Sequence, residues 1–177
     1  MLTENSLLFK KFDYVYIMSP SHREYKKFNL PAGNFLPHLD FTWINEKIKK
    51  HFNSTEYLNI LFVFDDVISD LHKNRYSKEI TDLIFNRRHL LNNGMVSIII
   101  TSQKYKFVPS QIRANLTVLI TFKLNNNEFK QISDEIIFSD CDFKDIVNFV
   151  FDDDKDSFLM YRLDSSIFFK KFDKINI

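Results

Sequence analysis

Two short apolar runs, each followed by polar residues, constrain the fold of this chain more than any other feature. The first run, Ile60–Phe64, is followed directly by Asp65 and Asp66. The second, Val96–Ile100, leads into the polar tip Thr101–Gln103. Two such runs on either side of a helix-like stretch predict neighbouring parallel strands that are buried on both faces. Because ligands bind at the carboxyl ends of strands in open α/β sheets, the two polar tips mark a candidate site.

The rest of the chain alternates between strand-like and helix-like patterns. We predict a strand over Tyr14–Met18, a helix over Asp40–Phe52 and a further helix over Lys78–Leu91 that Asn92–Gly94 ends. This alternation predicts an α/β fold with three layers and a mostly parallel sheet. No linker divides the chain, so we expect one domain over residues 1–177. Less regular patterns predict a strand at 117–122, helices at 128–138 and 143–150, and a short strand at 158–162.

The composition limits the possible classes of protein. A length of 177 residues is enough for one domain with a sizeable core. The 24 Lys and Arg residues nearly balance the 23 Asp and Glu residues, so the net charge of +1 gives no electrostatic indication of nucleic-acid binding, although a local basic patch is compatible with it. No apolar stretch approaches the roughly 18–20 residues of a membrane span. We therefore expect a soluble, intracellular protein without a membrane partner.

The paired acids at the end of the first strand allow two interpretations. In the functional one, one carboxylate orients Mg²⁺ through water while its neighbour polarises an attacking water. In the structural one, Asp65 and Asp66 simply end the strand and cap the next helix.

Several other polar residues also have both a functional and a structural interpretation. Arg87 and Arg88 lie late in the predicted helix, where cations are favoured by the helix dipole, but an arginine also suits a phosphate group. Gln103 at a strand tip is suited to holding the attacking water or sensing a terminal phosphate, or it is a solvated loop residue. Arg113 and Asn115 are either phosphate contacts or local helix caps.

The order of the motifs resembles that of a known family. The series resembles the poxvirus-type DNA-packaging ATPases of large double-stranded DNA viruses, which belong to the FtsK–HerA superfamily of P-loop NTPases. The resemblance covers about residues 12–122, and five motifs in order carry it. They are FDYVYIMSPS at 12–21, ILFVFDDV at 60–67, FNRRHL at 85–90, VSIIITSQ at 96–103 and QIRANLTVLITF at 111–122.

The resemblance implies a role for each candidate residue. Asp65 matches the Walker B acid that serves Mg²⁺ through water, and Asp66 matches the catalytic carboxylate. Gln103 matches the polar sensor. Arg88 is the best match to an arginine that acts on a neighbouring subunit's nucleotide, with Arg87 as the second choice. Arg113 and Asn115 match the I-[KR]-A-N segment, and we assign them to nucleotide binding.

The resemblance also implies cofactors, partners and a place of action. The cofactors are ATP and Mg²⁺. The partners are double-stranded DNA and the vertex of a preformed capsid. The subunits form a homo-oligomeric ring that pumps the DNA into the capsid. The place of action is the host cytoplasm, in a viral factory, or the virion.

One departure from the family pattern bears on all of these expectations. In the family a Walker A loop precedes the strand that corresponds to Tyr14–Met18, and these 177 residues contain no GxxxxGK[ST] sequence. We therefore expect a fold without the N-terminal strand and P-loop, with a motif-bearing core at 12–122 and a helix-and-strand extension at 123–177. We expect the isolated chain to be inactive as an ATP hydrolase.

Three explanations of this departure stay open. The chain is the C-terminal part of a packaging ATPase, or a degenerate paralogue that assembles without hydrolysis, or the partner of a separate polypeptide that supplies the P-loop. Two functions compete with the packaging ATPase: a non-catalytic interaction subunit that retains the fold, and an unrelated α/β nuclease or phosphatase that uses Asp65 and Asp66 with a metal.

Overall fold

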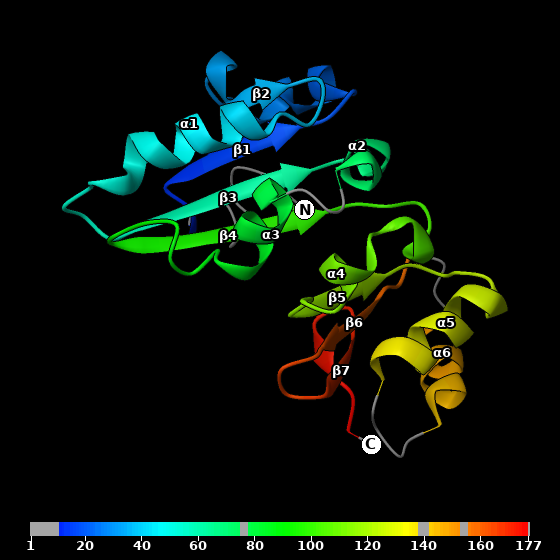
Figure 1. The fold of residues 1–177 in the computed structure, drawn as a ribbon. Coiled ribbons are helices and arrows are strands. Elements are labelled where there is room, and N and C mark those ends of the chain that lie inside the picture. Colours follow the sequence, from blue (N-terminus) through cyan, green and yellow to red (C-terminus); the bar gives the residue numbers. More distant parts are fainter. Residues whose placement is uncertain (1–10, 75–77, 138–141, 153–155, 177) are drawn as a thin grey trace. The chain divides into compact units, whose positions relative to one another are not determined.

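The structure is a computed structural model that describes residues 11–74, 78–137, 142–152 and 156–176 (Figure 1). The chain forms two compact units. The first consists of residues 1–103 with 107–109, and the second of residues 104–106 with 110–177. The expectation of a single domain, with a core that ends at residue 122, stays a prediction.

The first unit is built on a parallel sheet of four strands. These are β1 (Tyr14–Met18), β2 (Phe35–Leu36), β3 (Leu58–Phe64) and β4 (Gly94–Ile100), in the order β2-β1-β3-β4. Met18 lies opposite Phe64 in the register, and Phe64 lies opposite Ile100. The last residues of β1, β3 and β4 therefore meet at one edge of the sheet. The two apolar runs are neighbouring parallel strands, as predicted.

One face of this sheet is covered by helix α1 (Phe41–Phe52). The helix is capped by the preceding Asp40, whose carboxylate accepts hydrogen bonds from the backbone N–H groups of Thr42 and Trp43. Its buried residues include His51, and the Tyr16 hydroxyl lies 2.8 Å from the Nε2 atom of His51. On the other face, Val15, Ile17, Leu61 and Val63 form a buried cluster, against which Phe12, Tyr25, Leu30 and Phe35 pack.

The connection between β3 and β4 differs from the prediction. It contains a short helix that we did not predict, α2 (Ile68–Lys73), and a second helix, α3 (Lys78–Phe85), that ends earlier than the predicted Leu91. The Arg87 guanidinium donates to the carbonyl oxygen of Ile84 and so caps the last turn of α3. The chain then turns, with the N–H of His89 donating to Asn86 at 2.7 Å.

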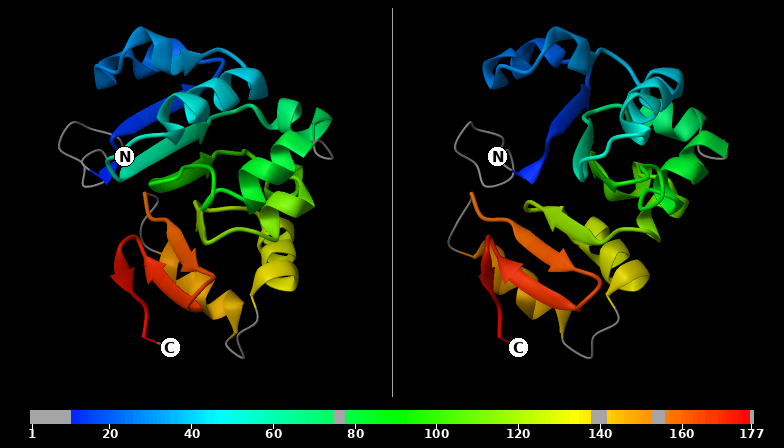
Figure 2. Two further views of the ribbon diagram at one scale, coloured as in Figure 1. Left: turned by 60° about the vertical axis from the view of Figure 1, so that its left-hand side comes forward. Right: turned by 90° about the vertical axis from the view of Figure 1, so that its left-hand side faces the viewer.

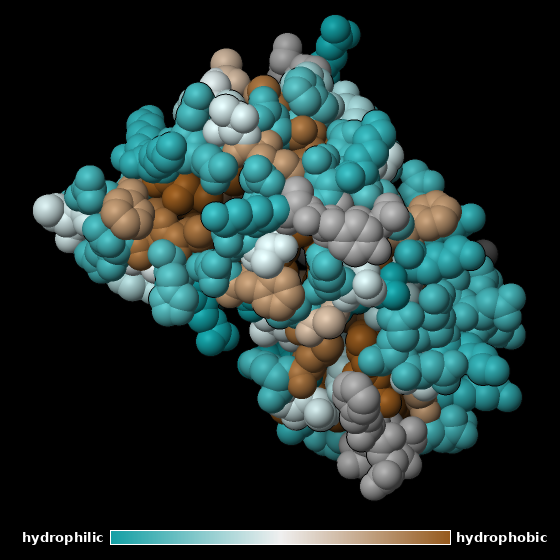
Figure 3. Space-filling model, viewed as in Figure 1, coloured by the Kyte–Doolittle hydropathy of each residue, from teal (hydrophilic) through white to brown (hydrophobic). Residues whose placement is uncertain are grey.

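Apolar side chains reach the surface of the first unit between α1 and α3 (Figure 3). A hollow of about 250 Å³ lies there, with Ile48 on α1 and Leu83 on α3 among its lining residues. Three short 3-10 segments complete the connections that the structure describes: η2 (His22–Phe28), η3 (Ala32–Asn34) and η4 (Tyr105–Phe107).

The second unit is an antiparallel sheet that carries two helices on one face (Figure 2). Val150 on α6 (Phe143–Phe151) and Ile132 on α5 (Asn126–Ile136) are fully buried against Tyr161 and Phe168 of the sheet. The predicted strand at 117–122 and both predicted helices are present, but the strands β7 (Ile167–Lys170) and β8 (Asp173–Lys174) were not predicted. The sheet order is β5-β6-β7-β8, formed by β5 (Val118–Thr121), β6 (Leu159–Arg162), β7 (Ile167–Lys170) and β8 (Asp173–Lys174); the helices are α4 (Ser110–Arg113), α5 (Asn126–Ile136) and α6 (Phe143–Phe151).

Among the residues that the structure describes, no helix is both long and apolar enough to cross a membrane.

Gly94 allows β4 to approach β3, and this gives a first test of the fold. A Cβ atom at Gly94 would lie 2.1 Å from the carbonyl oxygen of Leu58, and its φ of +148° is one that L side chains rarely adopt. We expect Gly94→Ala to lower the free energy of unfolding by roughly 2 kcal/mol or more in urea titrations. Gly33→Ala is the matched control, because a Cβ there would meet no atom within 4 Å. Equal stability of the two variants would contradict this register.

His51 gives a test through pH. Burial, with Lys50 and Lys47 nearby, lowers the pKa of His51 below 6.5. Because the unfolded chain then binds this proton more readily, the free energy of unfolding should fall as the pH drops from 7.5 through 6.5, by at most about 1.4 kcal/mol per pH unit. Substituting His51→Phe should flatten this dependence. A slope that persists in His51→Phe would refute the assignment.

Candidate functional site

The tips of three parallel strands bring two hydroxyl groups onto the carboxylate of Asp65. The Ser19 hydroxyl, beyond the end of β1, donates to Oδ2 of Asp65 at 2.8 Å. The Thr101 hydroxyl, beyond the end of β4, donates to Oδ1 at 2.7 Å. The Tyr25 hydroxyl in η2 also contributes to lowering the pKa of Asp65. The strand tip that we predicted as a site is therefore an organised cluster of oxygen atoms.

The surroundings of Asp65 favour its ionised form. Burial by itself raises the pKa of this carboxyl, but the hydrogen bonds from Thr101, Ser19 and Tyr25 outweigh burial, and the net pKa lies below its ordinary value. Burial, with the hydrogen bond to Asp65, raises the pKa of Tyr25 and keeps that hydroxyl a donor. Asp65 is thus a fixed, half-buried negative charge at neutral pH.

Asp66 differs from its neighbour in both backbone and exposure. Its φ of +55° is in the left-handed region, and its backbone N–H donates to the Thr101 hydroxyl at 3.2 Å. Asp66 is exposed, whereas Asp65 is half-buried. Helix α2 begins after Val67 without a side-chain cap, so the structure does not support the interpretation of these acids as helix caps.

The other predicted residues of the first unit lie before or after β4 in the chain. Gln103 follows the strand, whereas Arg87 and Arg88 precede it. Gln103 is exposed and follows β4 by three residues, on the same edge as the acids. Arg88 is exposed in the segment that leads from α3 into the start of β4, whereas the acids lie at the opposite end of that strand. Arg87 is half-buried and caps α3.

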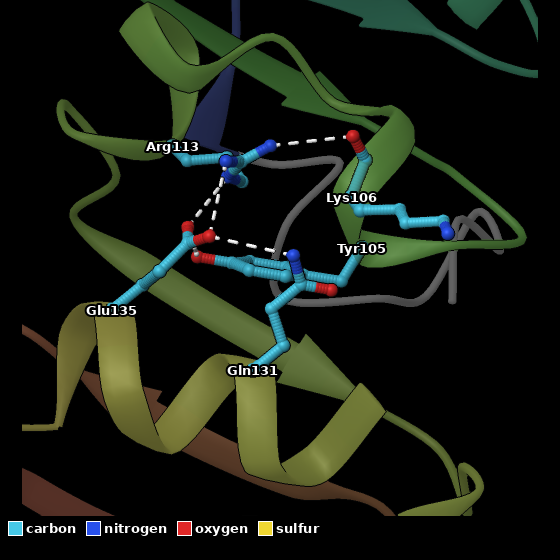
Figure 4. Close-up of polar contacts among 5 residues, drawn as sticks. All are labelled: Tyr105, Lys106, Arg113, Gln131 and Glu135. Atoms are coloured by element: carbon cyan, nitrogen blue, oxygen red, sulfur yellow. Dashed lines mark hydrogen bonds and ion pairs between the residues drawn. The ribbon is translucent and has the colours of Figure 1, made fainter. Parts of the chain in front are cut away.

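Arg113 belongs to the second unit and lies in a polar network (Figure 4). Its Nε atom donates to Oε2 of Glu135 at 2.8 Å and its Nη2 atom to Oε1 at 3.1 Å. The Tyr105 hydroxyl donates to the same carboxylate, and the guanidinium lies 5.1 Å from the Tyr105 ring centre. The side chain of Asn115, which follows α4, donates to the carbonyl oxygen of Gln111 in that helix at 2.9 Å. The roles of Arg113 and Asn115 in nucleotide binding stay predictions.

The cluster around Asp65 offers carboxylate oxygens that suit a Mg²⁺ ion. Among the described residues there is no group of three or more His, Cys, Asp or Glu side chains that could hold a metal ion. Asp65 and Asp66 nevertheless present hard carboxylate oxygens, and Mg²⁺ is commonly bound by one or two carboxylates with water and substrate phosphates as its other ligands. The residues present fit a Mg²⁺ ion of this kind.

The sequence indicated the acids but not the groups that hold them. Ser19 and Thr101 each follow a predicted strand, so their place at the strand tips could have been read from the parallel register. Tyr25 comes from a 3-10 segment, and no periodic pattern in the sequence predicts that its hydroxyl reaches Asp65.

A family model described as "Poxvirus A32 protein" matches residues 5–176. A search of curated proteins gave no match.

Solved structures of the genome-packaging NTPase B204 from Sulfolobus turreted icosahedral virus 2 are similar to this chain. The complex with ATP-γ-S has a TM-score of 0.66 at 17% identity, and the complex with AMP has a TM-score of 0.68 at 16% identity. B204 from Sulfolobus turreted icosahedral virus, described as a DNA-packaging ATPase, has a TM-score of 0.61 at 17% identity. Each match covers 96% of this chain and 86% of the other. At this identity the likeness establishes the fold, and the predicted α/β, P-loop NTPase-like class is confirmed.

The Arg113–Glu135 pair can be tested as a structural interaction. The Arg113 side chain is 14% exposed and the pair is bidentate, so Arg113→Ala should lower the free energy of unfolding by about 2 kcal/mol. The pair of Arg162 with Asp164 is the control, since both side chains are 46% exposed and Arg162→Ala should cost less than about 1 kcal/mol. Chemical denaturation of both variants measures the difference. Equal losses would show that Glu135 does not hold Arg113 in solution.

Proposed function

This chain belongs to the poxvirus A32 protein family, and we propose that it forms the catalytic-acid and sensor half of an ATP-driven motor that packages viral double-stranded DNA into capsids. The observation that supports this most is the cluster at the strand tips. There the Asp65 carboxylate is held by Ser19 and Thr101, and the exposed Asp66 follows it directly. The similar B204 structures are of a genome-packaging NTPase in complex with ATP-γ-S or AMP.

Each residue of the cluster has a distinct role in this proposal. When bound, a Mg²⁺ ion would neutralise negative charge at the reacting phosphate of ATP. Asp65 holds the ion through water, for which its ionised carboxylate is suited. Asp66 accepts the proton of the attacking water, because it is the exposed acid of the pair. Gln103, at the tip of the adjacent strand, orients that water and senses the terminal phosphate.

Arg88 acts across a subunit boundary in this proposal. It is exposed and lies before the start of β4, whereas the acids lie beyond the strand ends at the other edge. An arginine in that position suits the nucleotide of a neighbouring subunit better than that of its own, which requires a homo-oligomeric ring. Arg87 is less suited, since its guanidinium donates to the carbonyl oxygen of Ile84.

In the part of the chain that the structure describes, the free lateral side of β4 favours pairing with a further strand. In this proposal that strand carries the phosphate-binding loop. Among the described residues β4 is the outer strand of its sheet, and its seven residues include no charge and no proline. Met95 and Ile99 are 41% and 38% exposed there. The opposite outer strand, β2, has only two residues. Because long apolar edge strands are sites of strand pairing, we propose that the strand preceding the phosphate loop pairs with β4.

A second candidate function is a non-catalytic subunit that keeps the fold for contacts within the packaging assembly. The observation that favours it is that these 177 residues contain no GxxxxGK[ST] sequence. In either case we place the protein's action in the host cytoplasm or in the virion.

Substitution of the acids in the packaging assembly tests the proposal. The assembly should be purified from cells infected with virus that carries Asp65→Asn or Asp66→Asn, and its ATP hydrolysis and encapsidated DNA measured. Both substitutions should lower ATP hydrolysis at least about a hundredfold and leave capsids without DNA, because the proton acceptor or the metal-holding charge is lost. Arg162→Ala, in an exposed ion pair, is the control and should package normally.

The contrary outcomes separate the two candidates. Normal packaging by both acid variants, with loss of packaging when the gene is deleted, would establish the non-catalytic subunit. ATP turnover by the isolated 177-residue chain would disprove that it needs a phosphate loop from a partner strand. Metal-dependent DNA cleavage without nucleotide would indicate a nuclease instead.

A further inference from the structure

Thr101 contacts both acids through a single oxygen atom. Its Oγ1 atom donates a hydrogen bond to Oδ1 of Asp65 at 2.7 Å. The same atom accepts a hydrogen bond from the backbone N–H of Asp66 at 3.2 Å. The N–H of Thr101 in turn donates to the carbonyl oxygen of Phe64 at 3.0 Å, which continues the pairing of β3 with β4. Thr101 therefore connects the tip of β4 to two consecutive residues beyond β3.

This arrangement fixes the direction of the hydroxyl proton. A threonine hydroxyl has one proton to donate and lone pairs to accept with. Because the Asp66 N–H occupies a lone pair, the proton is free to point at Asp65. The contact also bears on the backbone of Asp66, whose φ of +55° is uncommon for a residue with a side chain. Removing the hydroxyl would release both constraints at once.

Ser19 holds Asp65 in a different way. Its hydroxyl donates to Oδ2 of Asp65 and accepts from the backbone N–H of Ser21, two residues along its own strand tip. Its contacts therefore orient Asp65 without reaching Asp66. The difference makes Thr101 the hydroxyl through which the two acids are coupled.

We propose that Thr101 is a positioning residue that sets the Asp65 and Asp66 carboxylates for metal and water, and that it couples them to the tip of β4. The proposal rests on the proposed function, because it gives the acids their roles. Gln103 follows Thr101 by two residues, so a shift of Gln103 toward a phosphate moves the same strand tip that holds both acids. Sensing at Gln103 and the geometry of the acids are then linked by one side chain.

The test compares Thr101→Val, which removes the hydroxyl at nearly constant volume, with Thr101→Ser, which retains it. Thr121→Val is the matched control, since Thr121 ends β5 and its hydroxyl donates to the neighbouring carbonyl oxygen of Phe122. All variants are made in the 177-residue chain. Two quantities are measured by NMR: the hydrogen-exchange rate of the Asp66 amide without metal or nucleotide, and the affinity for Mn²⁺ as a probe of the Mg²⁺ site.

Thr101→Val should speed exchange of the Asp66 amide about tenfold and weaken Mn²⁺ binding about tenfold. For metal affinity, a loss of about tenfold is the lower end of the range for residues that orient metal ligands. Thr101→Ser should restore both quantities, and Thr121→Val should change neither. Thr101→Ala replaces the valine variant if circular dichroism shows that the latter does not fold.

Two outcomes would overturn the proposal. One is unchanged Asp66 exchange and Mn²⁺ affinity in Thr101→Val. The other is a serine variant as impaired as the valine variant, because the methyl group and not the hydroxyl would then matter. A wild-type chain that binds no Mn²⁺ would contradict the proposed function, while the Asp66 exchange would still decide the role of Thr101.

Discussion

The parallel register of β3 between β1 and β4 is the constraint on which the site depends. Because Met18, Phe64 and Ile100 lie opposite one another, the residues that follow all three strands meet at one edge. A shift of one residue would turn the side chains of a strand to the other face and separate the hydroxyls from Asp65. Gly94 helps to secure this register at the other end of β4, where only a residue without a Cβ fits against Leu58.

The hydroxyl groups at this edge of the sheet offset the cost of burying the charged Asp65 carboxylate. A half-buried carboxylate is costly without compensating hydrogen bonds, and burial alone would favour the neutral acid. Hydroxyl donors from Ser19 and Thr101 offset this cost and keep Asp65 charged without placing a competing cation beside it. Neutral donors of this kind leave the negative charge available to a metal ion, whereas an arginine ion pair would neutralise it. Arg113 shows the contrast, because its guanidinium is engaged with Glu135.

The sequence predicted the parts of the fold that rest on local pattern. The strands β3 and β4 could be predicted because burial on both faces leaves a clear apolar run in the sequence. The helix after Asp40 could be predicted because its side-chain cap also leaves a clear signal. The early end of α3 was not predicted, since it depends on Arg87 reaching back to Ile84. The antiparallel β6–β7 pairing was also missed. Likewise, the acids could be identified at a strand tip, but the contact of Tyr25 with Asp65 arises from tertiary structure.

The central claim is that these strand tips are the acid and sensor half of an ATP site whose phosphate loop pairs beside β4. The most direct measurement is an experimental structure of the packaging assembly with Mg²⁺ and a non-hydrolysable ATP analogue. We expect the terminal phosphate between Gln103 and Asp66, a metal-bound water within hydrogen-bonding distance of Asp65, and a parallel strand paired with β4. A nucleotide bound away from Asp65, or β4 left as an outer strand in the assembly, would contradict this claim.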